Sequence, residues 1–121
     1  MSAGSREKFA VAVMRIDGAR LVRLSGEFDL AGVETFEHRL STDSDPATRT
    51  TIIDLSDLRF MDSSGLRALI GVEQALRVEG GRLVVIKSSG QVADLLELTG
   101  VAERLELADE VPSDLDRGDG S

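Results

Sequence analysis

The residues best suited to chemistry lie in a short polar turn, Asp62-Ser63-Ser64-Gly65, which combines a carboxylate, two hydroxyls and a glycine. Each polar side chain here is a good helix N-cap, because its oxygen can accept a backbone N–H group that has no partner within the first turn. A helix N-terminus also favours negative charge. The turn therefore has two interpretations: it caps a helix and does nothing more, or it holds a phosphate covalently on a serine.

Enzyme chemistry has weaker support in the sequence. A serine hydrolase would need a base, but the single histidine, His38, belongs to a predicted helix whose apolar face points elsewhere, and a Gly-x-Ser-x-Gly elbow is absent. Four carboxylates near the ends of predicted elements could gather around the turn: Asp29, Asp54, Asp57 and Asp62. They indicate a magnesium site only weakly. We therefore predict that the protein is not an enzyme and has no metal or cofactor.

Composition and charge exclude several other classes. The chain has 121 residues, enough for one domain, and no cysteine, which excludes disulfides and thiolate chemistry. Its net charge of −8 argues against sequence-independent binding of nucleic acid and against docking on anionic membranes. No apolar run approaches the roughly 20 residues that span a bilayer, and residues 1–8 lack the apolar stretch of a secretion signal. We expect a cytoplasmic domain over residues 9–108, between a flexible N-terminus (1–8) and a flexible acidic tail (109–121).

Apolar spacing predicts five strands and three helices. Strands are expected at 9–16, 19–25, 50–55, 82–87 and 104–107, and helices at 30–40, 63–78 and 91–98. Asp17-Gly18 favours a type I′ hairpin between the first two strands. Asp29 is the expected N-cap of the first helix, and Gly80-Gly81 ends the second. The order predicts an α/β fold: a mostly parallel sheet of four to five strands, with an antiparallel first strand and the helices mainly on one face.

The second predicted helix carries apolar residues on more than one side. At 100° per residue, the side assigned to the core holds Ala68, Leu69, Val72, Ala75 and Leu76. Leu66 and Ile70 project a quarter turn or more away from that side, close to Ser63. They are either the edge of a wide apolar stripe or part of a partner-binding patch beside a modifiable serine.

A resemblance to a known family is centred on this turn. The signature of the STAS domain, in particular that of anti-sigma factor antagonists, is similar to Ile53-Asp54-Leu55-Ser56-Asp57-Leu58-Arg59-Phe60-Met61-Asp62-Ser63-Ser64-Gly65-Leu66. The segments that flank the signature also match: Leu24-Ser25-Gly26-Glu27-Phe28-Asp29, Gly80-Gly81-Arg82-Leu83-Val84-Val85 and Leu95-Leu96-Glu97-Leu98-Thr99-Gly100-Val101. The resemblance covers about residues 9–107. It implies the STAS fold.

The resemblance further implies a phosphorylation-controlled switch that needs no cofactor of its own. In that family, the dephosphorylated antagonist binds an anti-sigma factor that is also a serine kinase with bound ATP, and this binding frees a sigma factor. The kinase phosphorylates the serine that corresponds to Ser63, the complex separates, and a metal-dependent serine phosphatase resets the switch. The residues that would shape the phosphorylation loop are Asp62, Ser64, Gly65 and Asp29.

Several expectations about the partner follow from the same resemblance. Contact with the kinase is assigned to Leu66, Ile70, Arg67 and Glu27, and the free protein is expected to be a monomer. Gly65 is interpreted as leaving room for a kinase to reach Ser63. Two alternatives stay open. One is a STAS interaction module that does not switch, in a sensory complex or beside a transporter; the other is a small nucleotide-binding or hydrolytic protein that uses the carboxylates near the turn.

Overall fold

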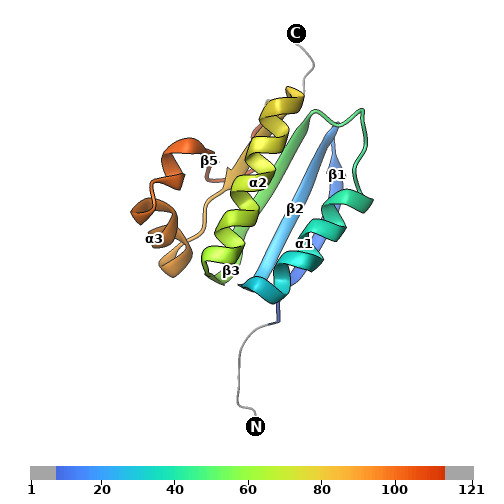
Figure 1. The fold of residues 1–121 in the computed structure, drawn as a ribbon. Helices are drawn as coiled ribbons and strands as arrows, with labels where there is room; N and C mark the ends of the chain where they lie inside the picture. Colours follow the sequence, from blue (N-terminus) through green and yellow to red (C-terminus); the bar gives the residue numbers. More distant parts are fainter. Residues whose placement is uncertain (1–7, 114–121) are drawn as a thin grey trace.

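The computed structural model describes residues 8–113, which form one mixed sheet covered by three helices (Figure 1). The elements are β1 (Ala10–Ile16), β2 (Ala19–Phe28), α1 (Leu30–Thr42), β3 (Thr50–Met61), α2 (Ser63–Glu79), β4 (Arg82–Ile86), α3 (Gly90–Leu98), the 3-10 helix η1 (Val101–Arg104) and β5 (Glu106–Ala108). The strands lie in the order β1-β2-β3-β4-β5. β1 is antiparallel to β2 and every later pair is parallel, which confirms the predicted architecture.

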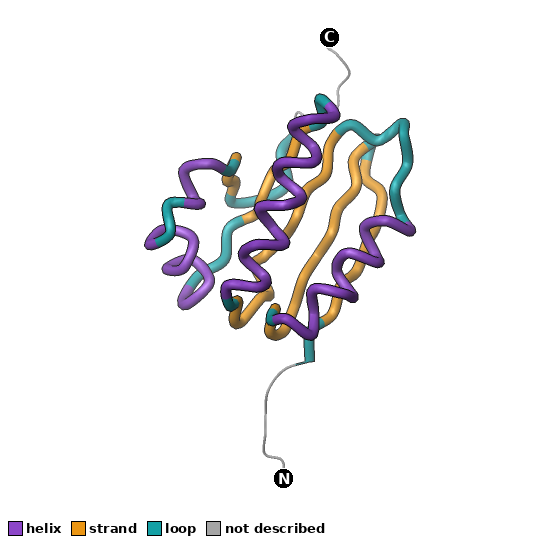
Figure 2. The backbone as a smooth tube through the Cα atoms, viewed as in Figure 1, coloured by secondary structure: helices purple, strands orange, loops and turns teal. Residues whose placement is uncertain are grey.

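The Asp17-Gly18 turn creates the one antiparallel pair of the described sheet. Asp17 has a φ of 44° and Gly18 a φ of 81°, and positive values at both central positions define a type I′ turn. After this hairpin, each helix returns the chain to the start of the next parallel strand. Because such crossovers are right-handed and the strands follow one another in order, the helices lie on the same face of the sheet (Figure 2).

Hydrophobic clusters lie on both faces of the sheet, because neighbouring residues of a strand point to opposite sides. The larger cluster lies between the sheet and the helices and includes Phe36 of α1, Leu69 of α2 and Val92 of α3, all fully buried. The smaller cluster lies on the other face and consists of Ala19, Leu21, Ile52, Val84 and Ile86. The helices therefore bury most of the core, and the second face is covered separately.

The C-terminal segment contributes to that second face. Val111 is half-buried and packs against the smaller cluster. The packed part of the chain therefore continues beyond the predicted domain limit at residue 108. Most of the two predicted flexible ends, namely residues 1–7 and 114–121, lies outside the described residues.

β2 and β3 are longer than the apolar pattern predicts. β2 reaches Phe28 rather than residue 25, and β3 reaches Met61 rather than residue 55. The two strands stay paired to these ends, but their register shifts twice along the way. Each shift interrupts the alternation of buried and exposed residues along the strand. In the sequence, the consecutive polar residues Ser56 and Asp57 therefore suggest a turn, although the strand continues through them. The last strand, β5, starts at Glu106 rather than at residue 104, because η1 precedes it.

The far half of β3 extends beyond the strand on its other side. β4 pairs with β3 only as far as Asp54. The side chain of Gln91, at the start of α3, supplies ladder-like bonds to the end of β3 instead. The Met61 N–H donates to Gln91 Oε1 at 2.9 Å, and Gln91 Nε2 donates to the Met61 carbonyl at 2.8 Å. This pair of bonds holds the strand end that immediately precedes the polar turn.

Candidate functional site

Ser63 occupies an exposed corner where β3 ends and α2 begins. Asp62 is the N-cap of α2, and its Oδ1 accepts the backbone N–H groups of Ser64 at 2.8 Å and of Gly65 at 3.1 Å. The Ser63 hydroxyl makes no hydrogen bond with any residue between 8 and 113. The structure therefore assigns the cap to Asp62 and leaves the Ser63 hydroxyl facing solvent.

The start of α1 lies beside this corner. The Asp62 N–H donates to the Phe28 carbonyl at 3.2 Å, which brings the end of β2 against the start of α2. The next residue, Asp29, caps α1 by accepting the Gly32 N–H at 3.3 Å, as the sequence predicts. Two helix N-termini therefore lie together, and each is capped by the aspartate that precedes it (Figure 1).

Gly65 is buried where α2 meets the end of β2. A β-carbon at this position would lie 2.6 Å from the Phe28 carbonyl oxygen and 2.9 Å from a carbon of the Phe28 ring. The prediction that Gly65 leaves room for a kinase is wrong, because a side chain at this position would point inward at β2 and not toward the surface. Glycine is needed here for the close approach of two backbones, and it positions Ser63 only indirectly.

Leu66 does not project from the core. It is only 9% exposed and belongs to the larger cluster, so the prediction that it lies outside the core face of α2 is wrong. Ala75, assigned to the core face, is exposed. The buried stripe is centred on the fully buried Leu69 rather than nearer Ala75, because α1 leaves the Ala75 side of α2 open. A helical wheel gives the spacing of apolar residues but not which side a neighbouring helix covers.

The other predicted contact residues, and two exposed apolar residues that were not predicted, belong to the elements that begin or end at this corner. Arg67 is exposed, whereas Ile70 and Glu27 are half-buried. Leu30, the first residue of α1, is 72% exposed, and Phe60, one residue before the end of β3, is 36% exposed. The sequence does signal both: a large apolar residue directly after an N-cap faces the open first turn, and Phe60 must point away from the buried Met61.

Asp54, one of the four carboxylates predicted to gather around the turn, is buried in the middle of β3, so the structure does not bring it to the turn. It accepts the Ser56 N–H at 2.9 Å, the Ser56 hydroxyl at 2.7 Å and Arg23 Nε at 3.2 Å. Burial raises the pKa of this carboxyl, but the bonds from Ser56 and Arg23 outweigh burial, and the pKa lies below its ordinary value. Within the described part of the chain, no three His, Cys, Asp or Glu side chains come together in a way that could hold a metal ion.

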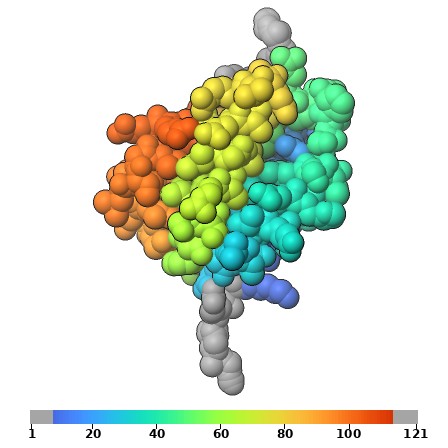
Figure 3. Space-filling view, viewed as in Figure 1, coloured from blue at the N-terminus to red at the C-terminus, as the bar shows by residue number. Residues whose placement is uncertain are grey.

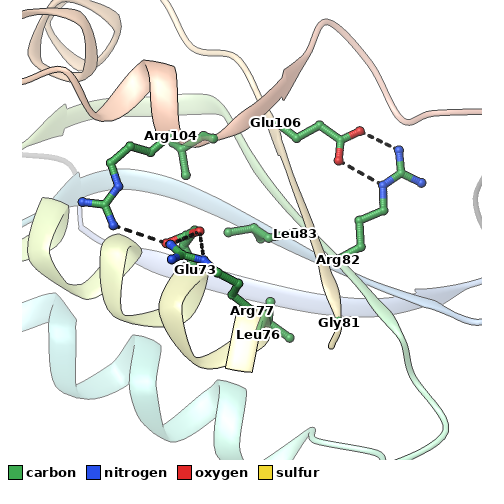
Figure 4. Close-up of a pocket in the computed structure, with 9 residues that line it drawn as sticks. Glu73, Leu76, Arg77, Gly81, Arg82, Leu83, Arg104 and Glu106 are labelled. Atoms are coloured by element: carbon green, nitrogen blue, oxygen red, sulfur yellow. Dashed lines mark hydrogen bonds and ion pairs between the residues drawn. The ribbon is translucent and has the colours of Figure 1, made fainter. Parts of the chain in front are cut away.

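A charged cleft of about 270 Å³ lies toward the C-terminal end of α2 (Figure 4). Glu73 accepts Arg77 Nη2 at 2.6 Å and lies 3.6 Å from Nη2 of Arg104, and Arg82 Nη2 pairs with Glu106 at 2.6 Å. The arginines and the glutamates of this cleft are therefore engaged with one another. The cleft lies where α2 packs beside β4, η1 and β5.

Comparison with known proteins places the chain in a family. The profile of the STAS domain matches residues 10–113. The chain therefore belongs to the STAS domain family, and the resemblance found at the polar turn is confirmed. None of the helices within residues 8–113 has the length and apolar character that a membrane crossing requires.

The relatives of this chain include regulators of sigma factors. BtrV of Bordetella bronchiseptica, described as an anti-sigma factor antagonist, is 31% identical over 86 residues, which are 71% of this chain and 74% of BtrV. The crystal structure of an anti-sigma factor antagonist from Mycobacterium paratuberculosis matches with a TM-score of 0.76 at 26% identity and 92% coverage of both chains. SpoIIAA of Bacillus, solved in its phosphorylated form, matches with a TM-score of 0.64 at 28% identity, over 85% of this chain and 93% of SpoIIAA.

Proposed function

We propose that this protein is an anti-sigma factor antagonist. In its dephosphorylated form it binds an anti-sigma factor that is also a serine kinase, with ATP bound on that partner, and so releases a sigma factor in the cytoplasm. Phosphorylation of Ser63 ends the interaction, and a serine phosphatase restores it. The observation that carries this proposal is an exposed serine at a capped helix start in a STAS chain. The names of relatives and the phosphorylated SpoIIAA structure support it.

The hydrogen bonds at the corner indicate where a phosphate on Ser63 would lie. A phosphoserine adds about −1.5 to −2 charges. The backbone N–H groups of Ser64 and Gly65, which could otherwise bind phosphate oxygens, are already bonded to the Asp62 carboxylate. The phosphate therefore stays at the surface, beside the carboxylates of Asp62 and Asp29. It leaves α2 intact because the helix does not depend on the Ser63 hydroxyl.

A dianion at this surface opposes docking much more than folding. Pressing it against a desolvated or acidic partner surface would cost several kcal/mol. About 4 kcal/mol corresponds to a thousandfold loss of affinity, which is enough to release a partner. Leu30, Phe60 and Arg67 have exposed side chains and belong to the three elements α1, β3 and α2 that begin or end at the Ser63 corner. We assign the partner contact to these three residues, with Ile70 and Glu27 at the edge and the buried Leu66 excluded.

Phosphotransfer to Ser63 tests the switch directly. Incubation with the candidate anti-sigma kinases of the source organism and ATP, followed by intact-mass spectrometry and site mapping, should show one phosphate on Ser63. Ser64→Ala is the matched control, because it removes the neighbouring hydroxyl and should be phosphorylated like the natural chain. Ser63→Ala should bind the kinase but not be released by ATP, whereas Ser63→Asp should bind about tenfold or more weakly.

Other results would lead to other functions. Equal affinity of the natural chain, Ser63→Ala and Ser63→Asp for the kinase would refute the interface mechanism. Phosphotransfer from none of the kinases would favour a STAS module that does not switch. Calorimetry with GTP or ATP and magnesium tests the nucleotide-binding alternative, and a flat titration removes it.

A further inference from the structure

A second candidate site lies in a groove between α1 and α2, on the side of the molecule toward their C-terminal ends. The two helices are close at their N-terminal ends and diverge along their length (Figures 1 and 2). The groove between them has a volume of about 500 Å³, within the usual range for small-molecule sites. Figure 3 shows it as a hollow between the yellow end of α2 and the green end of α1, with blue atoms of the N-terminal strands at its floor. Apolar and small side chains make up much of its lining: Leu40, Ala68, Gly71, Val72, Ala75 and Leu76.

A buried arginine without a carboxylate partner also lines this groove. Arg20 is only 9% exposed. Its Nη1 donates to the Leu40 carbonyl at 2.9 Å and its Nη2 donates to the Thr51 hydroxyl at 3.2 Å, while its Nε is buried without any acceptor. A guanidinium has five N–H donors, so two neutral acceptors leave it short of partners. No carboxylate within the described residues lies within ion-pair distance of Arg20. A buried charge in this state is costly unless something pairs with it.

Gly71 of α2 lines the same groove as Arg20 and faces open space. A β-carbon built on Gly71 would have no atom within 4 Å. Glycine inside a helix destabilises it relative to alanine, and close packing does not require glycine at this position, in contrast to Gly65. The open space at Gly71 therefore belongs to the groove.

We propose that the groove binds an aliphatic monocarboxylate, with the carboxylate at Arg20 and the hydrocarbon chain along the Gly71 face of α2. The lining supplies both parts of this chemistry: an apolar wall, and a buried guanidinium whose Nε has no acceptor and which has no carboxylate of the described residues at ion-pair distance. The charges of Asp43 and Glu79 reach Arg20 only from farther away. Glu37 and Glu79 also line the groove, and both are exposed. Their charges disfavour phosphates and other polyanions, so that a singly charged ligand is the best match. This site is independent of Ser63 and of the proposed switch.

Binding of octanoate tests the proposal, with octan-1-ol as the same chain without charge and inorganic phosphate as a charge without a chain. Calorimetry should show that octanoate binds with about 10- to 100-fold higher affinity than octan-1-ol, the value of a charge-assisted hydrogen bond, and that phosphate does not compete. In NMR spectra of the natural chain, octanoate should shift the backbone amide resonances of Leu40 and Gly71 and leave that of Ser63 in place.

Substitution of the buried Arg20 could impair folding, so two variants at Gly71 provide a test that does not depend on it. Gly71→Phe should fill the groove and abolish octanoate binding, whereas the matched control Gly71→Ala should keep it. Arg20→Met should lower octanoate affinity to that of octan-1-ol. The proposal is overturned if octanoate and octan-1-ol bind equally, if Gly71→Phe binds octanoate normally, or if octanoate does not bind the natural chain.

Discussion

The two ends of the α1–α2 pair differ in how completely their polar groups are satisfied. At the N-terminal ends, Asp29 and Asp62 cap the helices, and the missing side chain of Gly65 lets α2 touch the Phe28 backbone. Toward the C-terminal ends the helices diverge, a groove of about 500 Å³ opens, and Arg20 has more donors than acceptors. The capping groups at the first end have their hydrogen-bond partners within the protein, whereas Arg20 at the second end has a donor without an acceptor.

This difference is what the proposed switch requires: a modified corner that can change without weakening the fold. Where the capping aspartates already accept N–H groups of the first helical turns, a group added to an exposed hydroxyl changes the surface and little else. Where a buried donor lacks an acceptor, binding can contribute to stability. The corner at Ser63 is therefore suited to modification, and the groove at Arg20 is suited to ligand binding.

The largest expected effect comes from the two glycines of α2. Gly65→Ala should lower the free energy of unfolding by about 3 kcal/mol, because the new β-carbon would meet the Phe28 backbone, which cannot move aside cheaply. Gly71→Ala is the matched control in the same helix and should raise it by about 0.5–1 kcal/mol. Urea denaturation measures both values. Equal effects of the two substitutions would remove the contrast in packing between the two ends.

Asp54 lies in the middle of β3, between the two ends, and should give the next largest effect. Asp54→Ala should cost about 2 kcal/mol, because three hydrogen bonds to a charged group are lost. The pKa of Asp54 is lowered in the folded state, so its contribution is complete above the ordinary value of about 3.9. This contribution is lost as the pH falls through the lower folded value.

Acid denaturation curves measure this dependence. The Asp54→Ala variant should lose less stability than the natural chain on acidification, whereas Asp57→Ala, which alters an exposed neighbour, should follow the natural chain. A variant at Asp54 with an unchanged acid dependence would show that its charge does not stabilise β3.

The N-cap of α2 should give a smaller effect. Asp62→Ala should lower the free energy of unfolding by about 1 kcal/mol, because the Ser64 and Gly65 N–H groups lose their acceptor. Asp62→Asn keeps an acceptor and should cost only a few tenths of a kcal/mol. Chemical denaturation compares the two variants. If Asp62→Ala were as stable as Asp62→Asn, water would satisfy these donors equally well. The Asp62 side chain would then not stabilise the start of α2.

Ser63 itself should matter least to the fold. Ser63→Ala should change the free energy of unfolding by less than about 0.5 kcal/mol, the range typical of surface positions without special contacts. Thermal and urea denaturation both measure this value, and Ser64→Ala is the natural comparison at the half-buried neighbour. A loss well above that range would mean that the Ser63 hydroxyl supports α2, which would contradict its proposed role as a phosphorylation site without a structural function.

The sequence predicts much of this structure because several of its signals are local. Asp17-Gly18 specifies a hairpin through turn chemistry, and Asp29 specifies a helix start through capping. The strand order then follows from the alternation of strands and helices. The Asp62-Ser63 corner could be located because its residues are consecutive and have a recognisable cap function.

The features that could not be predicted depend on distant neighbours. The second half of β3 was hidden because register shifts against β2 break its alternation. The burial of Leu66 depends on where α1 and the sheet cover α2, which a helical wheel does not contain. Arg20 lies in a strand where a charged residue normally indicates a solvent-facing position, yet it is buried under the C-terminal end of α1.

The bonds between Gln91 and Met61 also have a consequence for the order in which the molecule is completed. They join positions 30 residues apart, and the later of the two belongs to α3. During synthesis, Ser63 emerges from the ribosome before α3 does. Until α3 emerges, the strand end next to this serine lacks its side-chain anchor, and the nascent protein presents the proposed docking surface in unfinished form. Maturation of that surface therefore waits for the C-terminal third of the polypeptide to emerge.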